Sequence, residues 1–174
     1  MGDSLRNLIE RIVRAFVDWV QRCLPPYDPS AWNDANGVQY NNNCYNYACD
    51  IKTGTYAQPG RGTGHEYTAI DCQHVDMGAV SDGLVPVECD SGCGCSECQH
   101  QVALVIKPGG FEFGDFHWYR KDRDGRWSNK MGGSPATNLD NSGNIITDPR
   151  TADRGSYTIF CGCYCVRKSS VTIN

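Results

Sequence analysis

One cysteine of this chain has the setting of a nucleophile. Cys44 follows the polar run 41–43 and precedes a short segment that is able to form a helix. A helix N-terminus carries roughly half a positive charge, which stabilises a thiolate. Two histidines, His100 and His117, lie further along the chain. An imidazole that the fold brings close could take the thiol proton and later protonate a leaving group, so this order of residues predicts a thiol hydrolase.

A predicted hairpin determines which polar groups can meet. The apolar run 102–106 predicts a buried strand, and 113–121 predicts its partner after a turn near 108–110. Cross-strand neighbours have β-carbons about 4.5–5.5 Å apart, so we expect His100 and His117 to approach each other on one face. Asn129 falls on a third predicted strand, 126–130, across the tight turn 122–125 from His117. Its amide could orient an imidazole.

The run 43–48, the run 100–106 and the strand with His117 resemble papain-like cysteine hydrolases. The compact bacterial branch that cleaves peptidoglycan amides is the most similar in size, and the resemblance covers roughly residues 39–130. It implies that Cys44 is the nucleophile. It implies either His100 as the base with His117 as its orienter, or His117 as the base with Asn129 as its orienter. It also implies an oxyanion hole with a side chain from one of three upstream residues: Gln39, Asn42 or Asn43.

The resemblance implies an α+β fold, with a papain-like core whose nucleophile helix packs on a small antiparallel sheet. We expect an N-terminal amphipathic helix in addition. The resemblance also implies a peptidase or amidase that acts through a thioester on a peptide, peptidoglycan or protein amide, with deamidase or transglutaminase-like chemistry as variants. The chain departs from the family where Tyr45 follows the cysteine and Gln101 follows His100. An alternative of another class stays open: a disulfide- or zinc-stabilised binding module or toxin without catalysis.

Eleven cysteines are a high number for 174 residues, and complete pairing of an odd number would leave one free thiol. The segment 89–98 is rich in cysteine, and such close spacing suits either disulfides or tetrahedral zinc. The metal candidates are Cys93, Cys95 and Cys98. Cysteines 161, 163 and 165 alternate on a predicted strand and should share a face. We expect cross-links here rather than a metal, no organic cofactor, and a structural zinc ion only as the alternative.

The first 26 residues predict a separate amphipathic helix. Apolar residues recur at three- and four-residue spacing between Ser4 and Leu24, and Pro25-Pro26 ends the helix. We expect this helix to pack on its own domain. The alternative is a docking or membrane-surface helix, and the acidic residues of its polar side weaken the membrane version. The domain itself spans 27–174, with the cysteine-rich insertion at 89–98.

The rest of the chain predicts few regular elements. Residues 66–80 favour a helix, and 84–88 and 157–166 favour strands. The segments 27–43 and 138–149 are rich in turn residues and predict loops.

Composition limits the classes of partner and compartment. A net charge of −4 gives no electrostatic footprint for nucleic acid. No run approaches the roughly 20 apolar residues of a membrane span, and no secretory signal is visible. The cysteine content permits an extracellular or effector role, because disulfides persist in oxidising compartments.

Overall fold

The computed structural model describes residues 2–34, 36–89, 95–96, 98–110 and 113–174. Its α-helices are α1 (Gly2–Cys23), α2 (Val38–Asn41), α3 (Cys44–Cys49) and α4 (Cys72–Ser81). Its strands are β1 (Val85–Val87), β2 (His100–Lys107), β3 (Asp115–Lys121), β4 (Trp127–Lys130), β5 (Ala136–Thr137) and β6 (Ile159–Val166). The expected α+β class is confirmed.

The described part of the domain is built on a six-stranded antiparallel sheet. The strand order is β1-β6-β2-β3-β4-β5, so the last long strand of the chain inserts beside the central strand β2. The predicted strands at 84–88, 102–106, 113–121, 126–130 and 157–166 are all present, with shifted ends. Strand β2 is buried over nearly its whole length, as its unbroken apolar run predicts. The short strand β5 was not expected.

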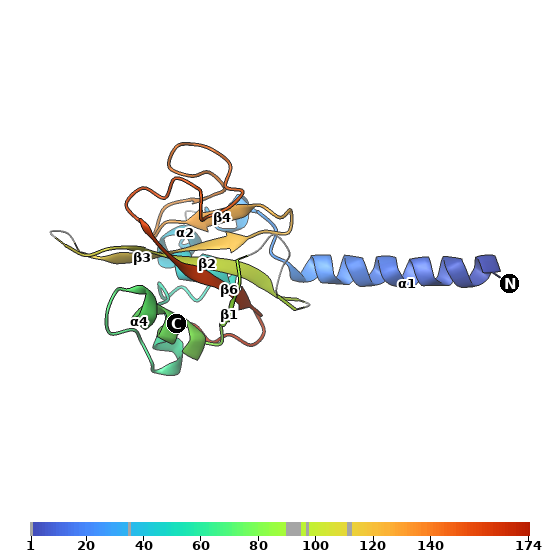
Figure 1. Ribbon diagram of the computed structural model, residues 1–174, viewed down its shortest axis with the longest axis horizontal. Helices are drawn as coiled ribbons and strands as arrows, with labels where there is room; N and C mark the ends of the chain where they lie inside the picture. Colours follow the sequence, from blue (N-terminus) through green and yellow to red (C-terminus); the bar gives the residue numbers. More distant parts are fainter. Residues whose placement is uncertain (1, 35, 90–94, 97, 111–112) are drawn as a thin grey trace.

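Each face of the sheet has its own apolar core, and the two cores alternate along the strands. Helices α3 and α4 cover one face, together with Leu104 and Trp118 of the central strands. The loop region 138–158 covers the other face, where Val105 and Tyr119 pack against Ile146. Figure 1 shows α4 below the sheet and the long loop above it. A side chain's sheet position therefore decides which core it joins.

Helix α1 does not pack on the domain, and that expectation is wrong. The helix projects away from the rest of the molecule along the long axis (Figure 1). Its end is fixed by the Cys23–Cys98 disulfide and by Arg123, whose guanidinium donates to the carbonyl of Leu24. The Pro25-Pro26 pair breaks the helix where it meets the domain. The apolar side chains of α1 consequently face solvent.

The nucleophile helix expected at Cys44 begins there, and its local sequence explains why. The Asn43 side chain accepts from the backbone N–H groups of Tyr45 and Asn46, and the Asn46 side chain accepts from the N–H of Asn43. This reciprocal capping box satisfies donors that a helix start leaves open. The helix predicted over 66–80 begins only at Cys72, where Asp71 caps it.

Candidate functional site

The Cys44 thiol is enclosed rather than presented to a substrate. Cys44 is only 5% exposed, and its Sγ lies 4.0 Å from the carbonyl oxygen of Phe116 on β3. Burial raises the pKa of Cys44 to about 12. The expected thiolate, with a pKa below that of a free cysteine, is therefore wrong. The helix start supplies too little positive potential to offset the desolvation of a buried sulfur.

The two histidines lie on opposite faces of the sheet. Val105 pairs with His117 in the β2–β3 register, whereas His100 pairs with Val166 of β6. His117 joins the face of the 138–158 loop, where its ring packs against Tyr157 at 5.2 Å. His100 points to the helix face. The expectation that the hairpin brings both rings to one face is wrong, because their positions in the paired strands have opposite parity.

Each histidine has a structural partner. His117 Nε2 lies 3.1 Å from Asn129 Oδ1, so the predicted contact between these two residues is present. His100 Nε2 lies 2.7 Å from the carbonyl oxygen of Ala48 in α3. Burial lowers the pKa of both histidines to about 4, so both are neutral at pH 7. Among the described residues no hydrogen bond joins the Cys44 thiol to either ring, and the arrangement holds no thiolate–imidazolium pair.

The amides expected at an oxyanion hole are used in loop structure. Asn43 donates to the carbonyl of Ala57, Asn42 donates to Val38, and Gln39 donates to Gly133. The sequence reasoning missed the residue that organises this region. Lys130 is fully buried, and its ammonium donates to the carbonyls of Gln39, Asn42 and Gly132. Nothing in the strand pattern distinguishes this lysine from one on the surface.

The cysteines form a set of disulfides. Among the described residues the bridges are Cys23–Cys98, Cys72–Cys161, Cys89–Cys163 and Cys95–Cys165. Cys95 and Cys98, two of the candidate zinc ligands, lie in disulfides and hold no free thiolate for a metal. Cys93 lies outside the described residues. Cys44 and Cys49 are both free and buried, so the pairing that would leave a single free thiol does not occur.

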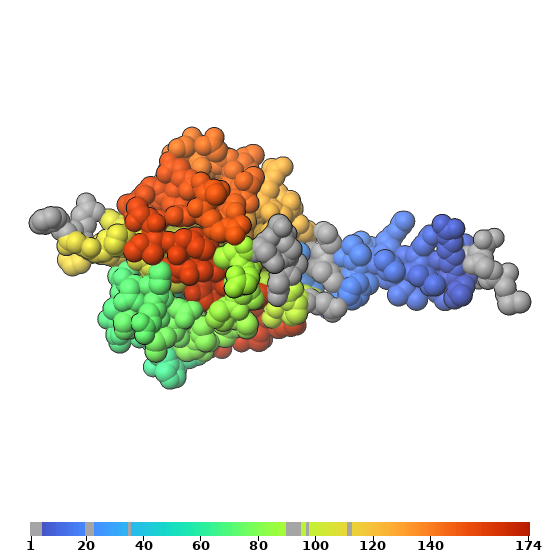
Figure 2. All heavy atoms as spheres, viewed as in Figure 1, coloured from blue at the N-terminus to red at the C-terminus, as the bar shows by residue number. Residues whose placement is uncertain are grey.

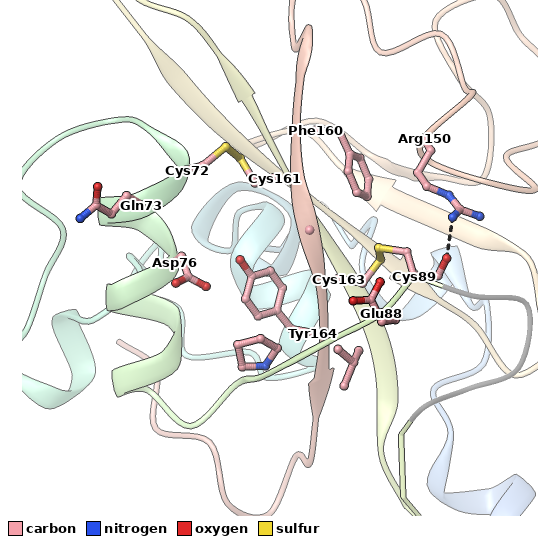
Figure 3. Close-up of a pocket in the computed structure, with 13 residues that line it drawn as sticks. Cys72, Gln73, Asp76, Glu88, Cys89, Arg150, Phe160, Cys161, Cys163 and Tyr164 are labelled. Atoms are coloured by element: carbon pink, nitrogen blue, oxygen red, sulfur yellow. Dashed lines mark hydrogen bonds between the residues drawn. A yellow bond between two sulfur atoms is a disulfide. The ribbon is translucent and has the colours of Figure 1, made fainter.

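Strand β6 carries three of these bridges, and they reach different segments. The register slips between Leu104 and Val105, opposite the region of Cys161. This bulge turns Cys161 towards the helix face, where it meets Cys72 of α4, while Cys163 meets Cys89 on the other face. The expectation that all three strand cysteines share a face is therefore wrong. Figure 3 shows the two disulfides on opposite sides of β6.

A surface hollow of about 710 Å³ lies between α4, β1 and β6 (Figure 3). Its lining carries two carboxylates, Asp76 and Glu88, and the Arg150 guanidinium donates to the Cys89 carbonyl at its edge. Two disulfides form part of its wall. In the described ranges no group of three or more His, Cys, Asp or Glu side chains is placed to hold a metal ion. None of the described helices is long and apolar enough to cross a membrane.

Comparison with known proteins gives a clear relationship. The chain is 43% identical over 141 residues to insoluble matrix shell protein 1 of Ruditapes philippinarum, a match that spans 80% of this chain and 88% of that protein. The chain belongs to the family of this shell matrix protein. No family model matches the sequence, and no solved structure matches the chain.

This family membership overturns the hydrolase expectation. The relative is named as an insoluble matrix protein and not as a peptidase, amidase or other enzyme. The resemblance to papain-like cysteine hydrolases and the expected amide hydrolysis are therefore contradicted. Nothing supports the expected peptide or peptidoglycan substrates. The papain-like core is not confirmed either, since no solved structure matches. The motifs that carry the resemblance are short. A non-catalytic domain with a buried cysteine on a helix and histidines on the sheet has the same order of residues. The disulfides and the relative fit an extracellular location.

Proposed function

We propose that this chain is a non-catalytic structural component of an extracellular matrix of the shell type. The observation that carries the proposal is the match to insoluble matrix shell protein 1 over 80% of this chain and 88% of the relative. A match of that extent spans most of the chain rather than one short motif. The role of a matrix component is therefore the simplest one for the domain to share with its relative.

The disulfide arrangement supports a structural role. Three bridges join β6 to α4, to the segment after β1 and to the segment before β2, and a fourth joins the end of α1 to Cys98. A disulfide restricts the unfolded chain and typically contributes about 2–4 kcal/mol to stability. A domain cross-linked in this way resists unfolding in an oxidising, extracellular environment.

The chemistry around Cys44 and His117 supports a role without catalysis. The Cys44 thiol is protonated and buried, and His117 is neutral and bonded to Asn129. A nucleophile needs a thiolate within reach of substrate, and a buried protonated sulfur provides neither. These side chains serve packing and hydrogen bonding within the domain.

The proposal is tested by locating the protein in its source tissue. We expect it in the extracellular matrix residue that remains after extraction with salt and detergent, with the Cys72–Cys161 peptide pair linked when digestion is done without reductant. Recovery of the chain from the cell lysate with these cysteines reduced would overturn the proposal.

A turnover assay is the second test. Purified oxidised protein and a Cys44→Ser variant should both show only background hydrolysis of peptide amides and peptidoglycan. Turnover that depends on Cys44 would show that the domain is catalytic and would also overturn the proposal.

A further inference from the structure

Helix α1 carries a continuous apolar stripe with no partner in the described molecule. Figure 2 shows the helix as a rod that stands clear of the domain. Eight large apolar side chains along it are each about half exposed, between 47% and 60%. They are Leu5, Leu8, Ile9, Ile12, Val13, Phe16, Val17 and Trp19.

The area of this stripe exceeds what a monomer ordinarily exposes. Eight half-exposed side chains, each with roughly 150–250 Å² when fully exposed, amount to roughly 700 Å². The largest apolar patch of a typical monomeric protein is about 300–600 Å², and larger patches mark interaction sites. The size of the stripe thus marks it as an interaction surface.

A partner would also stabilise the helix itself. The stability of a helix in a protein comes mostly from packing of its apolar face rather than from intrinsic propensity. Helix α1 contains three valines and two isoleucines, which are weaker helix formers than alanine. Its own domain does not supply the packing, because the Cys23–Cys98 bridge fixes the helix end at a position from which α1 projects outwards.

The spacing within the stripe fits another helix. Leu5, Ile9, Ile12, Phe16 and Trp19 follow one another at intervals of four, three, four and three residues. This is the heptad spacing of the first and fourth positions, which pack between neighbouring helices in bundles and coiled coils. The flanking apolar side chains widen the stripe and bury further area in such a contact.

The charge balance of the helix favours another copy of the chain over an anionic partner. The segment 2–23 carries arginines at 6, 11, 14 and 22 and acidic residues at 3, 10 and 18, so its charges nearly cancel. Arg6 and Glu10 already pair along the helix at 3.2 Å. An anionic membrane or a nucleic acid would favour an excess of basic residues, as amphipathic membrane helices have. Two nearly neutral copies meet without net repulsion.

From this size, spacing and charge balance, we infer that copies of this chain associate through the apolar stripes of their α1 helices. Two stripes of roughly 700 Å² bury roughly 1,400 Å² in total, which falls within the 1,200–2,000 Å² of stable protein–protein interfaces. The contact uses the same surface on both copies, as two-fold symmetric interfaces do. The domains then lie outside the helical contact. The inference does not rest on the matrix role, because it concerns how copies meet in any setting.

The test is sedimentation velocity of the full oxidised chain over a range of concentrations, with two matched variants. Ile12→Glu places a charge at the centre of the stripe, and Asn7→Glu makes the same charge change on the polar side of the helix. We expect the parent and Asn7→Glu to associate alike, and Ile12→Glu to weaken association at least tenfold. Because α1 lies outside the domain, the melting temperature of the domain should be the same in all three proteins, which excludes misfolding as the cause.

Three results would overturn the inference. One is a parent chain that stays monomeric at every concentration. Another is association that Ile12→Glu leaves unchanged, which would place the contact elsewhere on the molecule. The third is a monomer that cosediments with phosphatidylcholine or phosphatidylserine vesicles and loses this binding in Ile12→Glu, which would make the stripe a membrane surface.

Discussion

Removal of single disulfides should reveal that the bridges act as one network. The comparison uses Cys23→Ala/Cys98→Ala and Cys72→Ala/Cys161→Ala. The two bridges are matched, because all four cysteines are only partly buried and their replacement opens little cavity. Their sequence separations are 75 and 89 residues, so separation alone predicts the larger loss for the second pair.

The bridges that remain in each variant reverse the expected order of the two stability losses. Without the Cys72–Cys161 bridge, the Cys89–Cys163 bridge still connects its ends through 72–89 and 161–163, an effective loop of about 19 residues. Without the Cys23–Cys98 bridge, the shortest remaining connection runs through 23–72, 161–165 and 95–98, an effective loop of about 56 residues. The chain-entropy relation then gives losses of about 3 and about 4 kcal/mol, respectively.

Equilibrium unfolding in guanidinium chloride at mildly acidic pH measures these losses, since thiol–disulfide exchange is slow where thiols are protonated. Low protein concentration keeps association of α1 out of the measurement. We expect the Cys23/Cys98 variant to lose about 1 kcal/mol more than the Cys72/Cys161 variant. A larger loss in the Cys72/Cys161 variant would refute the network reasoning. A loss below about 1 kcal/mol in both would refute the entropic account of these bridges.

The remaining predictions concern buried titratable groups. Because burial raises the pKa of Cys44 to about 12, alkylation of Cys44 by iodoacetamide near pH 8 should be at least ~100-fold slower in the folded protein than in denaturant, as peptide mapping would show. His100 and His117 have folded pKa values of about 4 against an ordinary value of 6.5, so the unfolded chain takes up protons first on acidification. The free energy of unfolding should therefore fall between pH 6.5 and 4, by up to about 3 kcal/mol per histidine, and a flat profile would contradict this. Arg120→Met should cost about 3–5 kcal/mol in denaturant melts because it leaves a buried carboxylate unpaired, whereas Arg126→Met at an exposed pair should cost under about 0.5 kcal/mol.

Periodicity and turn chemistry were sufficient to predict most of the helices and strands. The heptad-like pattern of α1, the apolar run of β2 and the turn at 122–125 each occur where the sequence indicates. These features depend on neighbours along the chain, and local propensity encodes them. The same reasoning predicted the helix start at Cys44 and the contact between His117 and Asn129, because a tight hairpin fixes that contact.

Long-range features could not be predicted in this way. The disulfide partners of β6 depend on the register shift between β2 and β6 beside Leu104, and no residue type in either strand indicates this shift. Lysine and arginine usually lie on the surface, yet Lys130 and Arg120 are fully buried, with backbone or carboxylate partners. Helix α3 and the loops around it supply these partners. The sequence of a strand does not encode which distant segments pack on it.

The failure of the hydrolase expectation follows from what residue spacing can encode. A cysteine at a helix start followed in the sequence by histidines on strands occurs whether or not the folded chain brings the two groups together. Reactivity requires in addition that sulfur and imidazole share a face and that solvent or substrate reaches them. In this chain Cys44 faces the β3 backbone, and the His117 ring occupies the opposite face of the same strand. Strand β3 lies between the two side chains, so each one packs in a separate core. Only the register of the sheet decides whether a cysteine and a histidine in this order meet or are separated.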